Sequence, residues 1–284
     1  MPKKLTPLIA AMSDKISIIT VNFNNKAGLQ KTISSVINQV FKPIEFILID
    51  GDSTDGSKEL LQDNQNHFTY WTSEPDHGIY HAMNKGIKIA TGDYLLFLNS
   101  GDCLADEQVL EKISRKIDGT YDIYYGDIIF ERIKKSTKVI FPEKLTFNFF
   151  VTDNLSHQAT FIKKMLFDKF FYYNENFKIA SDWEFMIYAI CKRNVSYQHL
   201  DLLVTVYDGT GLSSNSDNYK MLYEERSISM NKYFPAFITD YEQLSELENK
   251  RIKQVLELKK HPLAWKILKA CIKAIFLFRP KKGL

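Results

Sequence analysis

The stretch that decides the fold is residues 94–102, YLLFLNSGD, in which an apolar run of strand length ends in small and polar residues. The same arrangement occurs twice upstream. Residues 15–23, KISIITVNF, are followed by two asparagines, and residues 43–50, PIEFILID, are followed by a Gly-Asp-Ser turn. Between these runs, residues 26–40 and 80–90 carry apolar side chains at helical spacing. Strands that alternate with helices predict a parallel sheet with helices on both faces.

The rest of the chain continues this pattern less regularly. We predict helices at residues 57–64, 105–117 and 182–191, and strands at residues 67–72, 122–130, 138–141, 159–162 and 195–207. Residues 208–218, DGTGLSSNSDN, are predicted to form a mobile polar loop, and everything from residue 219 onward has helical spacing. The sequence therefore predicts an α/β catalytic domain over residues 1–218 and a helical C-terminal extension over residues 219–284.

The composition is that of a globular protein that can bury its own core, with 45% hydrophobic and 25% charged residues in a chain of 284. Three cysteines without a C-x-x-C pair argue against a disulfide framework and a zinc knuckle, and they favour a reducing, cytosolic compartment. The first 14 residues lack the apolar core of a signal peptide, and no run reaches the roughly 18 apolar residues of a membrane span.

The positive charge is concentrated at the C-terminus. Residues 259–284 contain eight Lys and Arg and no acid, so the rest of the chain carries a net charge of −5 within a total of +3. On a helix over residues 263–278, Lys266, Lys269 and Lys273 share one face and apolar side chains cover most of the remainder. This pattern predicts binding to an anionic membrane surface and not to nucleic acid. The alternative is that the apolar side packs on the body or on a second subunit, as in a homodimer.

Polar side chains gather where the predicted strands end. In an open parallel sheet, ligands bind at the carboxyl ends of the strands. Asp102 could hold a divalent cation there, since magnesium and manganese prefer oxygen ligands, although N-S-G-D is also good turn chemistry. Asp50 could accept hydrogen bonds from a base or a ribose, or could belong to a turn. A G-x-G-x-x-G fingerprint and a P-loop are both absent from the sequence.

Three further segments are rich in polar groups. Residues 73–86, SEPDHGIYHAMNKG, lead into and through a predicted helix, and Lys85 within them could meet a phosphate or lie in solvent. Asp182 follows Ser181 at a helix start, where it could be a general base facing the cleft or a first-turn acid. His157 and Gln158 could contact a phosphate or a metal, or form a satisfied pair in the core.

Taken together, these segments resemble the family 2 glycosyltransferases of the GT-A fold, in particular bacterial members that build surface polysaccharides. The resemblance covers residues 16–214 and rests on six motifs in family order: SIITVNFN, LIDGDSTDGS, EPDHGIYHAMNKGIKIATGDY, FLNSGD, SHQA and ASDWE. It implies a mixed, mostly parallel central sheet flanked by helices.

The resemblance also implies roles for individual residues. Asp102 matches the metal-binding carboxylate of the D-x-D-D segment and would hold Mn²⁺ or Mg²⁺, and Asp182 matches the catalytic base. His157 and Gln158 would contact the diphosphate or the acceptor. The implied nucleotide-binding residues are Thr20, Asn22, Asn24, Asp50, Asp76, Asn84, Lys85, Asn99 and Ser100.

The chain departs from the family pattern at five positions. Asn99 and Gly101 stand where the D-x-D-D segment has acids, so a single carboxylate remains for the metal. Met83 stands where the family has an arginine, Ser181 replaces the first acid of the E/D-D motif, and Asp52 replaces a small residue.

The implied function is that of an inverting glycosyltransferase. It would move a hexose-type sugar from a nucleotide-diphosphate donor, with a UDP-sugar as first candidate, to a hydroxyl of a glycan or lipid-linked acceptor in bacterial polysaccharide synthesis. The loop over residues 208–218 would close over the nucleotide and exclude water. The basic tail would hold the protein on the inner face of the cell membrane. A catalytically inactive sugar-nucleotide-binding or glycan-binding module and a sugar nucleotidyltransferase are the alternatives, although the latter class uses a Gly-rich, basic first loop that residues 22–26 do not provide.

Overall fold

The computed structural model describes residues 15–41, 44–132, 135–211, 216–240 and 250–277. Three features predicted above lie partly or wholly outside these ranges: the first 14 residues, the middle of the loop over residues 208–218, and the end of the basic tail with Phe278, Arg279, Lys281 and Lys282.

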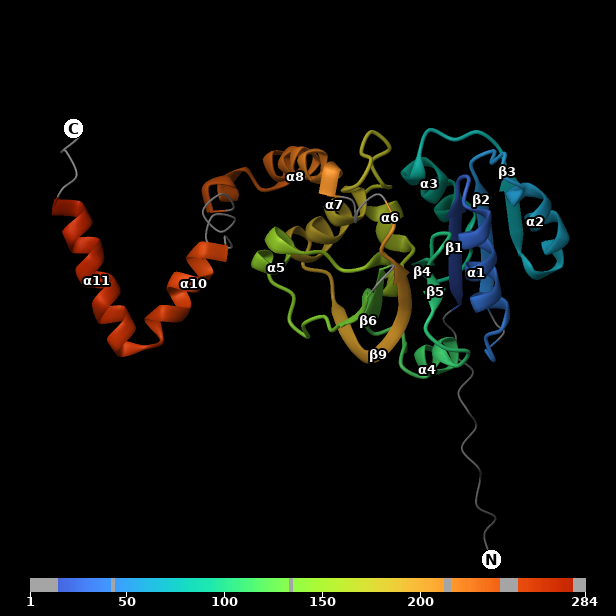
Figure 1. Ribbon diagram of the computed structural model, residues 1–284. Helices are drawn as coiled ribbons and strands as arrows, with labels where there is room; N and C mark the ends of the chain where they lie inside the picture. Colours follow the sequence, from blue (N-terminus) through green and yellow to red (C-terminus); the bar gives the residue numbers. More distant parts are fainter. Residues whose placement is uncertain (1–14, 42–43, 133–134, 212–215, 241–249, 278–284) are drawn as a thin grey trace, which may run out of the picture.

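The core of the molecule is one mixed sheet, whose strands in the described part run in the order β3-β2-β1-β4-β8-β6-β9-β5, with β7 paired to β6. The first half is parallel: β1 (Ile16–Asn22) lies between β2 (Ile44–Asp50) and β4 (Tyr94–Phe97), and β3 (Tyr70–Ser73) pairs with the outer side of β2. Helices α1 (Lys26–Ile37), α2 (Ser57–Asp63) and α3 (Ile79–Ile89) connect these strands. The alternation predicted from the apolar runs is therefore confirmed (Figure 1).

The second half makes the sheet mixed. Strand β8 (Thr160–Lys163) runs antiparallel to β4 and to β6 (Ile123–Arg132), and β9 (Tyr197–Asp208) runs parallel to β6. The short strand β5 (Cys103–Leu104) and β7 (Lys135–Val139) complete the sheet by antiparallel pairing with β9 and β6. Helices α4 (Val109–Ser114), α5 (Phe147–Thr152), α6 (Met165–Lys169) and α7 (Ser181–Ile187) belong to this half.

Several boundaries differ from the sequence prediction. The strand expected at residue 67 begins at Tyr70, because Gln65–His67 forms a 3-10 turn. The helix expected over residues 105–117 spans only Val109–Ser114, and the strand expected over residues 138–141 is Lys135–Val139. The helix expected over residues 182–191 is α-helical only to Ile187 and continues as a π-helical turn, Tyr188–Lys192. Helix α5, whose first turn is capped by Thr146, was not predicted, and neither was strand β5, since two residues carry no periodicity.

The C-terminal part is helical, as the sequence predicts. It comprises α8 (Tyr219–Tyr233), a 3-10 turn at Pro235–Phe237, α10 (Lys250–Lys259) and α11 (Pro262–Leu277). The helices differ in their packing. Met230 and Phe234, in and just after α8, belong to the core of the body, whereas α11 has no buried residue. In Figure 1, α10 and α11 extend away from the sheet as a bent pair. No helix in the described ranges combines the length and the hydropathy of a membrane span.

Candidate active site

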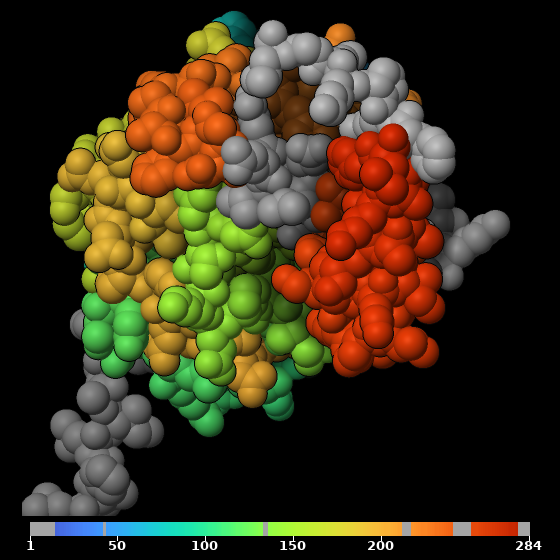
Figure 2. Space-filling view, turned by 90° about the vertical axis from the view of Figure 1, so that its left-hand side faces the viewer, coloured from blue at the N-terminus to red at the C-terminus, as the bar shows by residue number. Residues whose placement is uncertain are grey.

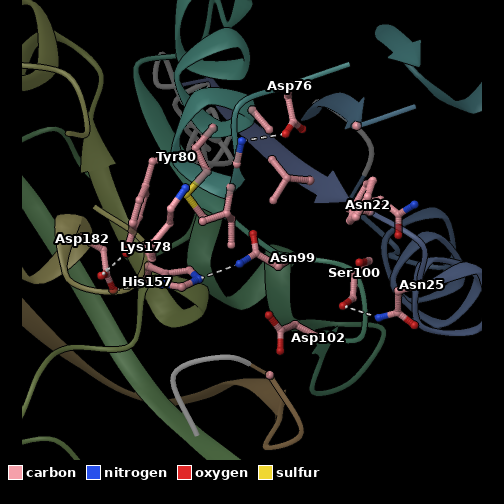
Figure 3. Close-up of a pocket in the computed structure, with 18 of the residues that line it drawn as sticks. Asn22, Asn25, Asp76, Tyr80, Asn99, Ser100, Asp102, His157, Lys178 and Asp182 are labelled. Atoms are coloured by element: carbon pink, nitrogen blue, oxygen red, sulfur yellow. Dashed lines mark hydrogen bonds and ion pairs between the residues drawn. The ribbon is translucent and has the colours of Figure 1, made fainter. Parts of the chain in front are cut away.

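A cavity of about 800 Å³ opens at the carboxyl ends of the parallel strands, the position that the fold predicts for a ligand. Its walls come from the ends of β1 and β2, the start of α3, the loop after β4, the 3-10 turn His157–Ala159, α7 and the end of β9. Figure 3 shows the polar side chains that converge on it. The predicted site residues that line this cavity are Asn22, Asp76, Asn99, Ser100, Asp102, His157, Gln158 and Asp182.

Asp182 lies in the first turn of α7, with its carboxylate held by three side chains from different elements. The Tyr80 hydroxyl donates to Oδ1 at 3.1 Å, the Asn154 amide donates to Oδ2 at 3.1 Å, and His157 Nδ1 lies 3.2 Å from Oδ2. Burial alone would raise the pKa of Asp182, but the hydrogen bond from His157 and further donors outweigh it and hold this pKa below its ordinary value. The carboxylate is therefore ionised near neutral pH and able to accept a proton.

A second carboxylate, Asp102, lies 3% exposed at the other end of the cavity. Its Oδ1 accepts a hydrogen bond from the backbone N–H of Asp208 at 3.0 Å. Burial raises the pKa of Asp102 to about 6. Gly101, at φ +109°, lies so close to Asp208 that an added Cβ would be 2.8 Å from Asp208 Oδ2. The strand-end turn that brings the two acids together therefore requires a glycine.

Asp102 and Asp208 provide hard oxygen ligands, the type that magnesium and manganese prefer. Within the ranges that the structure describes, no group of three or more His, Cys, Asp or Glu side chains is arranged to hold a metal ion. The residues therefore fit a cation that is shared with a diphosphate and water, and they do not fit a cation bound by protein ligands alone.

The amide of Asn22 is fixed at the end of β1 by a buried network. Its Nδ2 donates to Asp50 Oδ1 at 2.7 Å, and Asp50 also accepts from Ser53 and Ser73. Asp50 has no exposed surface and does not line the cavity, so it reaches the site only through Asn22. The buried Asn22 Oδ1 has no hydrogen-bond partner among the residues that the structure describes, which leaves it available to a ligand donor.

Four other predicted nucleotide-binding residues also lie outside the cavity walls. Thr20 donates to the Leu98 carbonyl at 2.7 Å, and Asn24 accepts from the backbone N–H of Thr54. Asn84 binds both the N–H and the C=O of Tyr173. Lys85 forms an ion pair of 2.8 Å with Glu74. These contacts explain the four residues as supports of the loops around the site, and direct nucleotide contacts remain predictions for them.

The structure adds site residues that the sequence did not single out. Tyr80 and Asn154 contact Asp182, and Lys178 and Asp208 line the cavity. Asp52, which the sequence marks only as a departure from the family pattern, lines the cavity too. Asp52 adopts φ +63°, a left-handed conformation in the turn after β2. Tyr80 was read only as part of an amphipathic helix, and Asp208 as the start of a loop. Their roles depend on pairing of β9 with β5 and on the packing of α3 against α7, which local patterns do not report.

Helix α8 supports the loop that leads to Asp182. The buried carboxylate of Glu225 accepts hydrogen bonds from the backbone N–H groups of Lys178, Ile179 and Ala180, at 2.7, 3.0 and 2.9 Å. These three residues immediately precede α7. The guanidinium of Arg226 lies over the Trp183 ring, 4.8 Å from its centroid. The first helix of the C-terminal extension thus fixes the loop that leads to Asp182.

Known proteins resemble this chain in sequence and in fold. An uncharacterised glycosyltransferase of Mycobacterium tuberculosis is 33% identical over 211 residues, covering 71% of this chain and 78% of the relative. A PGL/p-HBAD biosynthesis glycosyltransferase of Mycobacterium bovis is 30% identical over 207 residues, covering 70% and 79%.

Among solved structures, S. aureus TarS 1-349 in complex with UDP-GlcNAc matches with a TM-score of 0.63 at 19% identity, covering 81% of this chain and 70% of that fragment. The mannosyltransferase PcManGT of Pyrobaculum calidifontis, in complex with GDP-Man and Mn²⁺, matches with a TM-score of 0.60 at 13% identity, covering 94% and 81%. Both likenesses confirm the GT-A fold.

The model of the family described as glycosyl transferase family 2 matches residues 17–177. This match contains the ends of β1, β2 and β4 and stops five residues before Asp182, whose position at the cavity comes from the structure. The chain belongs to glycosyl transferase family 2.

Proposed function

We propose that the chain is an inverting glycosyltransferase that moves a hexose-type sugar from a nucleotide-diphosphate donor to a hydroxyl of a glycan or lipid-linked acceptor in bacterial polysaccharide synthesis. The observation that carries the proposal is the position of Asp182. It is a carboxylate with a lowered pKa, held in the wall of the cavity that also contains Asp102 at the opposite end.

The proposed reaction is a single displacement. The acceptor hydroxyl oxygen forms a bond to the anomeric carbon while its proton passes to Asp182 as general base. The bond from the anomeric carbon to the phosphate oxygen breaks, and the nucleotide diphosphate leaves with the electron pair. Attack opposite the leaving group inverts the anomeric centre.

The start of α3 suits the negative charge of the donor. Pro75 to Tyr80 lie along the cavity. Gly78 precedes α3 and has no side chain that could cap the helix, so the N–H groups of the first turn of α3 are available to an anion. Asn22 Oδ1 supplies an acceptor for a base or ribose donor group. The relatives of known structure were solved with UDP-GlcNAc and GDP-Man, and we propose a UDP-sugar as the donor for this chain.

A divalent cation, Mn²⁺ or Mg²⁺, would be held by Asp102 with Asp208 beside it, and it would neutralise charge on the leaving diphosphate. The mannosyltransferase PcManGT, which has a similar fold, was solved with Mn²⁺. Asn99 and Ser100, on the same turn, would line the diphosphate side of the cavity.

The function can be tested with purified protein and a panel of UDP-, GDP- and dTDP-sugars in the presence of Mn²⁺. We expect a thermal shift with one nucleotide class and release of UDP that rises when a glycan or lipid-linked acceptor is added. Asp182→Asn should lower kcat by about 10²-fold or more with little change in donor affinity. Donor binding without any transfer would favour the inactive binding module, and release of pyrophosphate from a sugar phosphate and UTP would favour a nucleotidyltransferase.

We also propose that α10 and α11 hold the enzyme on the anionic inner face of the cell membrane. Lys266, Lys269 and Lys273 line one face of α11, and the exposed apolar residues beside them include Leu263 and Leu277, which are 74% and 82% exposed. Residues 250–277 carry eight Lys or Arg and one Glu. Figure 2 shows α11, in red, on the surface of the molecule. Two such basic surfaces would repel each other in a dimer, whereas anionic lipids complement them.

Flotation with vesicles of phosphatidylglycerol and phosphatidylcholine tests this surface. Each lysine near an anionic surface contributes about 1 kcal/mol, so reversing three of them should weaken binding by about 100-fold or more. The test variant carries Lys266→Glu, Lys269→Glu and Lys273→Glu, and the control with the same net charge carries Lys58→Glu, Lys144→Glu and Lys169→Glu on the exposed surface of the body. Equal vesicle binding by both variants, or a dimer that dissociates when Leu263 and Ile267 become serine, would exclude the membrane as partner.

A further inference from the structure

We propose that His157 is a positioning residue that links the donor side of the cavity to the base, by holding the Asp182 carboxylate in one orientation under the control of Asn99. This inference rests on the proposed role of Asp182. It differs from a direct contact between His157 and the diphosphate or acceptor, the role that the family resemblance implies.

The geometry is a continuous chain of three side chains. Asn99 Nδ2 lies 3.1 Å from His157 Nε2, and His157 Nδ1 lies 3.2 Å from Asp182 Oδ2. Figure 3 shows the imidazole between the two other groups, with Asn99 approaching from the loop after β4. Both His157 and Asp182 are mostly buried, with side chains 19% and 13% exposed. The chain therefore spans the cavity wall from the Asp102 turn to α7.

The donors and acceptors along this chain assign the tautomer of the imidazole. An amide nitrogen can only donate, so Asn99 Nδ2 requires Nε2 of His157 to be the acceptor. The proton of the neutral ring then resides on Nδ1, which donates to Asp182. A ring with its proton on Nε2 would face the Asn99 amide with two donors and would leave Asp182 without this hydrogen bond.

Asn99 has a second polar atom that points to control by the donor. Its Oδ1 is buried without a hydrogen-bond partner in the described part of the chain, and Asn99 lines the cavity. A hydroxyl of the donor that donates to this oxygen would fix the amide with Nδ2 toward His157. Donor binding would thereby favour the tautomer that orients the base, so the base becomes fully oriented only when the sugar nucleotide is present.

The surroundings of Asp182 make His157 the adjustable contact. Tyr80 from α3 and Asn154 from the segment after α5 also donate to the carboxylate, and Tyr173 lies near enough to feel its charge. Within the described residues, none of these three forms a hydrogen bond to the Asp102 turn, whereas His157 contacts Asn99 there. Burial raises the pKa of Asp182 and the hydrogen bond from His157 lowers it, so loss of this bond would raise the pKa.

The test compares replacements that keep one half of the imidazole. The amide nitrogen of asparagine takes the place of Nδ1, and that of glutamine takes the place of Nε2. The probe reaction is release of UDP from UDP-glucose and UDP-N-acetylglucosamine, with water as acceptor and Mn²⁺ present. The donor concentration is varied up to about 1 mM, the upper end of ordinary KM values. We expect His157→Ala and His157→Gln to lower kcat by about 10- to 100-fold with donor KM nearly unchanged, and His157→Asn to recover most of the loss.

Two further readouts separate positioning from a general loss of structure. The acidic limb of the kcat profile should move to higher pH in His157→Ala and His157→Gln but not in His157→Asn. In ¹⁵N spectra of histidine-labelled protein, His157 should carry its proton on Nδ1, and Asn99→Ala should weaken this preference, because only the Asp182 carboxylate then favours it. His67→Ala, at an exposed histidine on the 3-10 turn before β3, is the matched control and should change nothing.

The outcomes are distinct. A proton on Nε2 of His157 in the wild type, or equal activity of the Asn and Gln variants, would overturn the inference. A rise in donor KM with unchanged kcat in His157→Ala would instead assign His157 to the diphosphate. If the wild type neither binds nor releases the nucleotide from any UDP-, GDP- or dTDP-sugar, with or without an acceptor, the proposed function fails, whereas the tautomer measured by ¹⁵N still decides whether the chain from Asn99 to Asp182 exists.

Discussion

Glu225→Gln should destabilise the protein far more than an ordinary surface substitution. The Glu225 side chain accepts three backbone hydrogen bonds: Oε1 from Lys178, and Oε2 from Ile179 and Ala180. A glutamine can place its one oxygen where Oε2 lies and keep two of them. Its NH₂ group then faces the Lys178 N–H, and two donors oppose each other in a buried position.

The magnitude follows from these three bonds. A buried donor left without a partner costs about 1–3 kcal/mol, and each bond that changes from a charged to a neutral acceptor loses about 1 kcal/mol. The sum for Glu225→Gln is about 3–5 kcal/mol of unfolding free energy. Because the affected residues lead directly into α7, Asp182 should also lose its orientation, and kcat should fall together with stability.

Urea unfolding at pH 7 measures this, and the neighbouring Glu224 provides the matched control. Glu224 is 64% exposed and lies 3.9 Å from Lys220, so Glu224→Gln should cost less than about 0.5 kcal/mol. The midpoint for Glu225→Gln should fall well below both the wild type and the control at an unchanged m-value. A difference between the two variants of less than about 0.5 kcal/mol, within ordinary surface effects, would refute this account of α8.

Three more predictions concern the boundary of the catalytic unit, the cation and the response to pH. A chain that ends after residue 240 should fold and bind donor, whereas one that ends after residue 218 lacks Glu225 and the core residues Met230 and Phe234 and should not unfold cooperatively, as circular dichroism with urea will show. Asp102→Ala should abolish the part of donor affinity that depends on Mn²⁺ in calorimetry, and equal affinity with EDTA in the wild type would contradict the cation site. The pKa of Glu45 is lowered, because hydrogen bonds from Ser17 and Thr91 outweigh its burial. A carboxylate with a lowered pKa stabilises the folded state at pH values above its pKa in the unfolded chain, and this stabilisation is lost as the pH falls through its pKa in the folded protein. Glu45→Gln should therefore cost stability at pH 7 but progressively less below about pH 4.5.

The parts of the fold that follow from local periodicity were predictable from sequence. The apolar runs that form β1, β2 and β4 are buried throughout or nearly so. Apolar and polar residues therefore alternate little along them, which is the pattern of a central parallel strand. The two-residue strand β5 and the antiparallel insertion of β8 between β4 and β6 depend on pairings between residues far apart in the chain. No local pattern encodes such pairings.

The candidate site divides in the same way. Asp102 and Asp182 were predicted because motifs mark strand ends and helix starts, and both line the cavity. Asp50 was also predicted at a strand end, but four hydrogen bonds to Asn22, Ser53 and Ser73 occupy its carboxylate in the interior. A motif identifies a position in the chain, whereas the number of acceptor sites already satisfied by the protein decides whether a side chain remains available to a ligand.

Counting these satisfied groups also distinguishes the two ends of the cavity. Near Asp182 the carboxylate is surrounded by protein donors from α3, from the segment after α5 and from the 3-10 turn, and α8 fixes the loop behind it. Near Asn22 and Asn99, two buried amide oxygens have no hydrogen-bond partner among the described residues, and Oδ1 of Asn154, beside Asp182, is a third. A buried acceptor without a partner costs about 1–3 kcal/mol, which a ligand donor can recover on binding. We therefore expect a ligand to complete the end of the cavity at Asn22 and Asn99, whereas the Asp182 carboxylate itself is oriented by the protein. Asn99 with His157 is the proposed route by which the first end can act on the second.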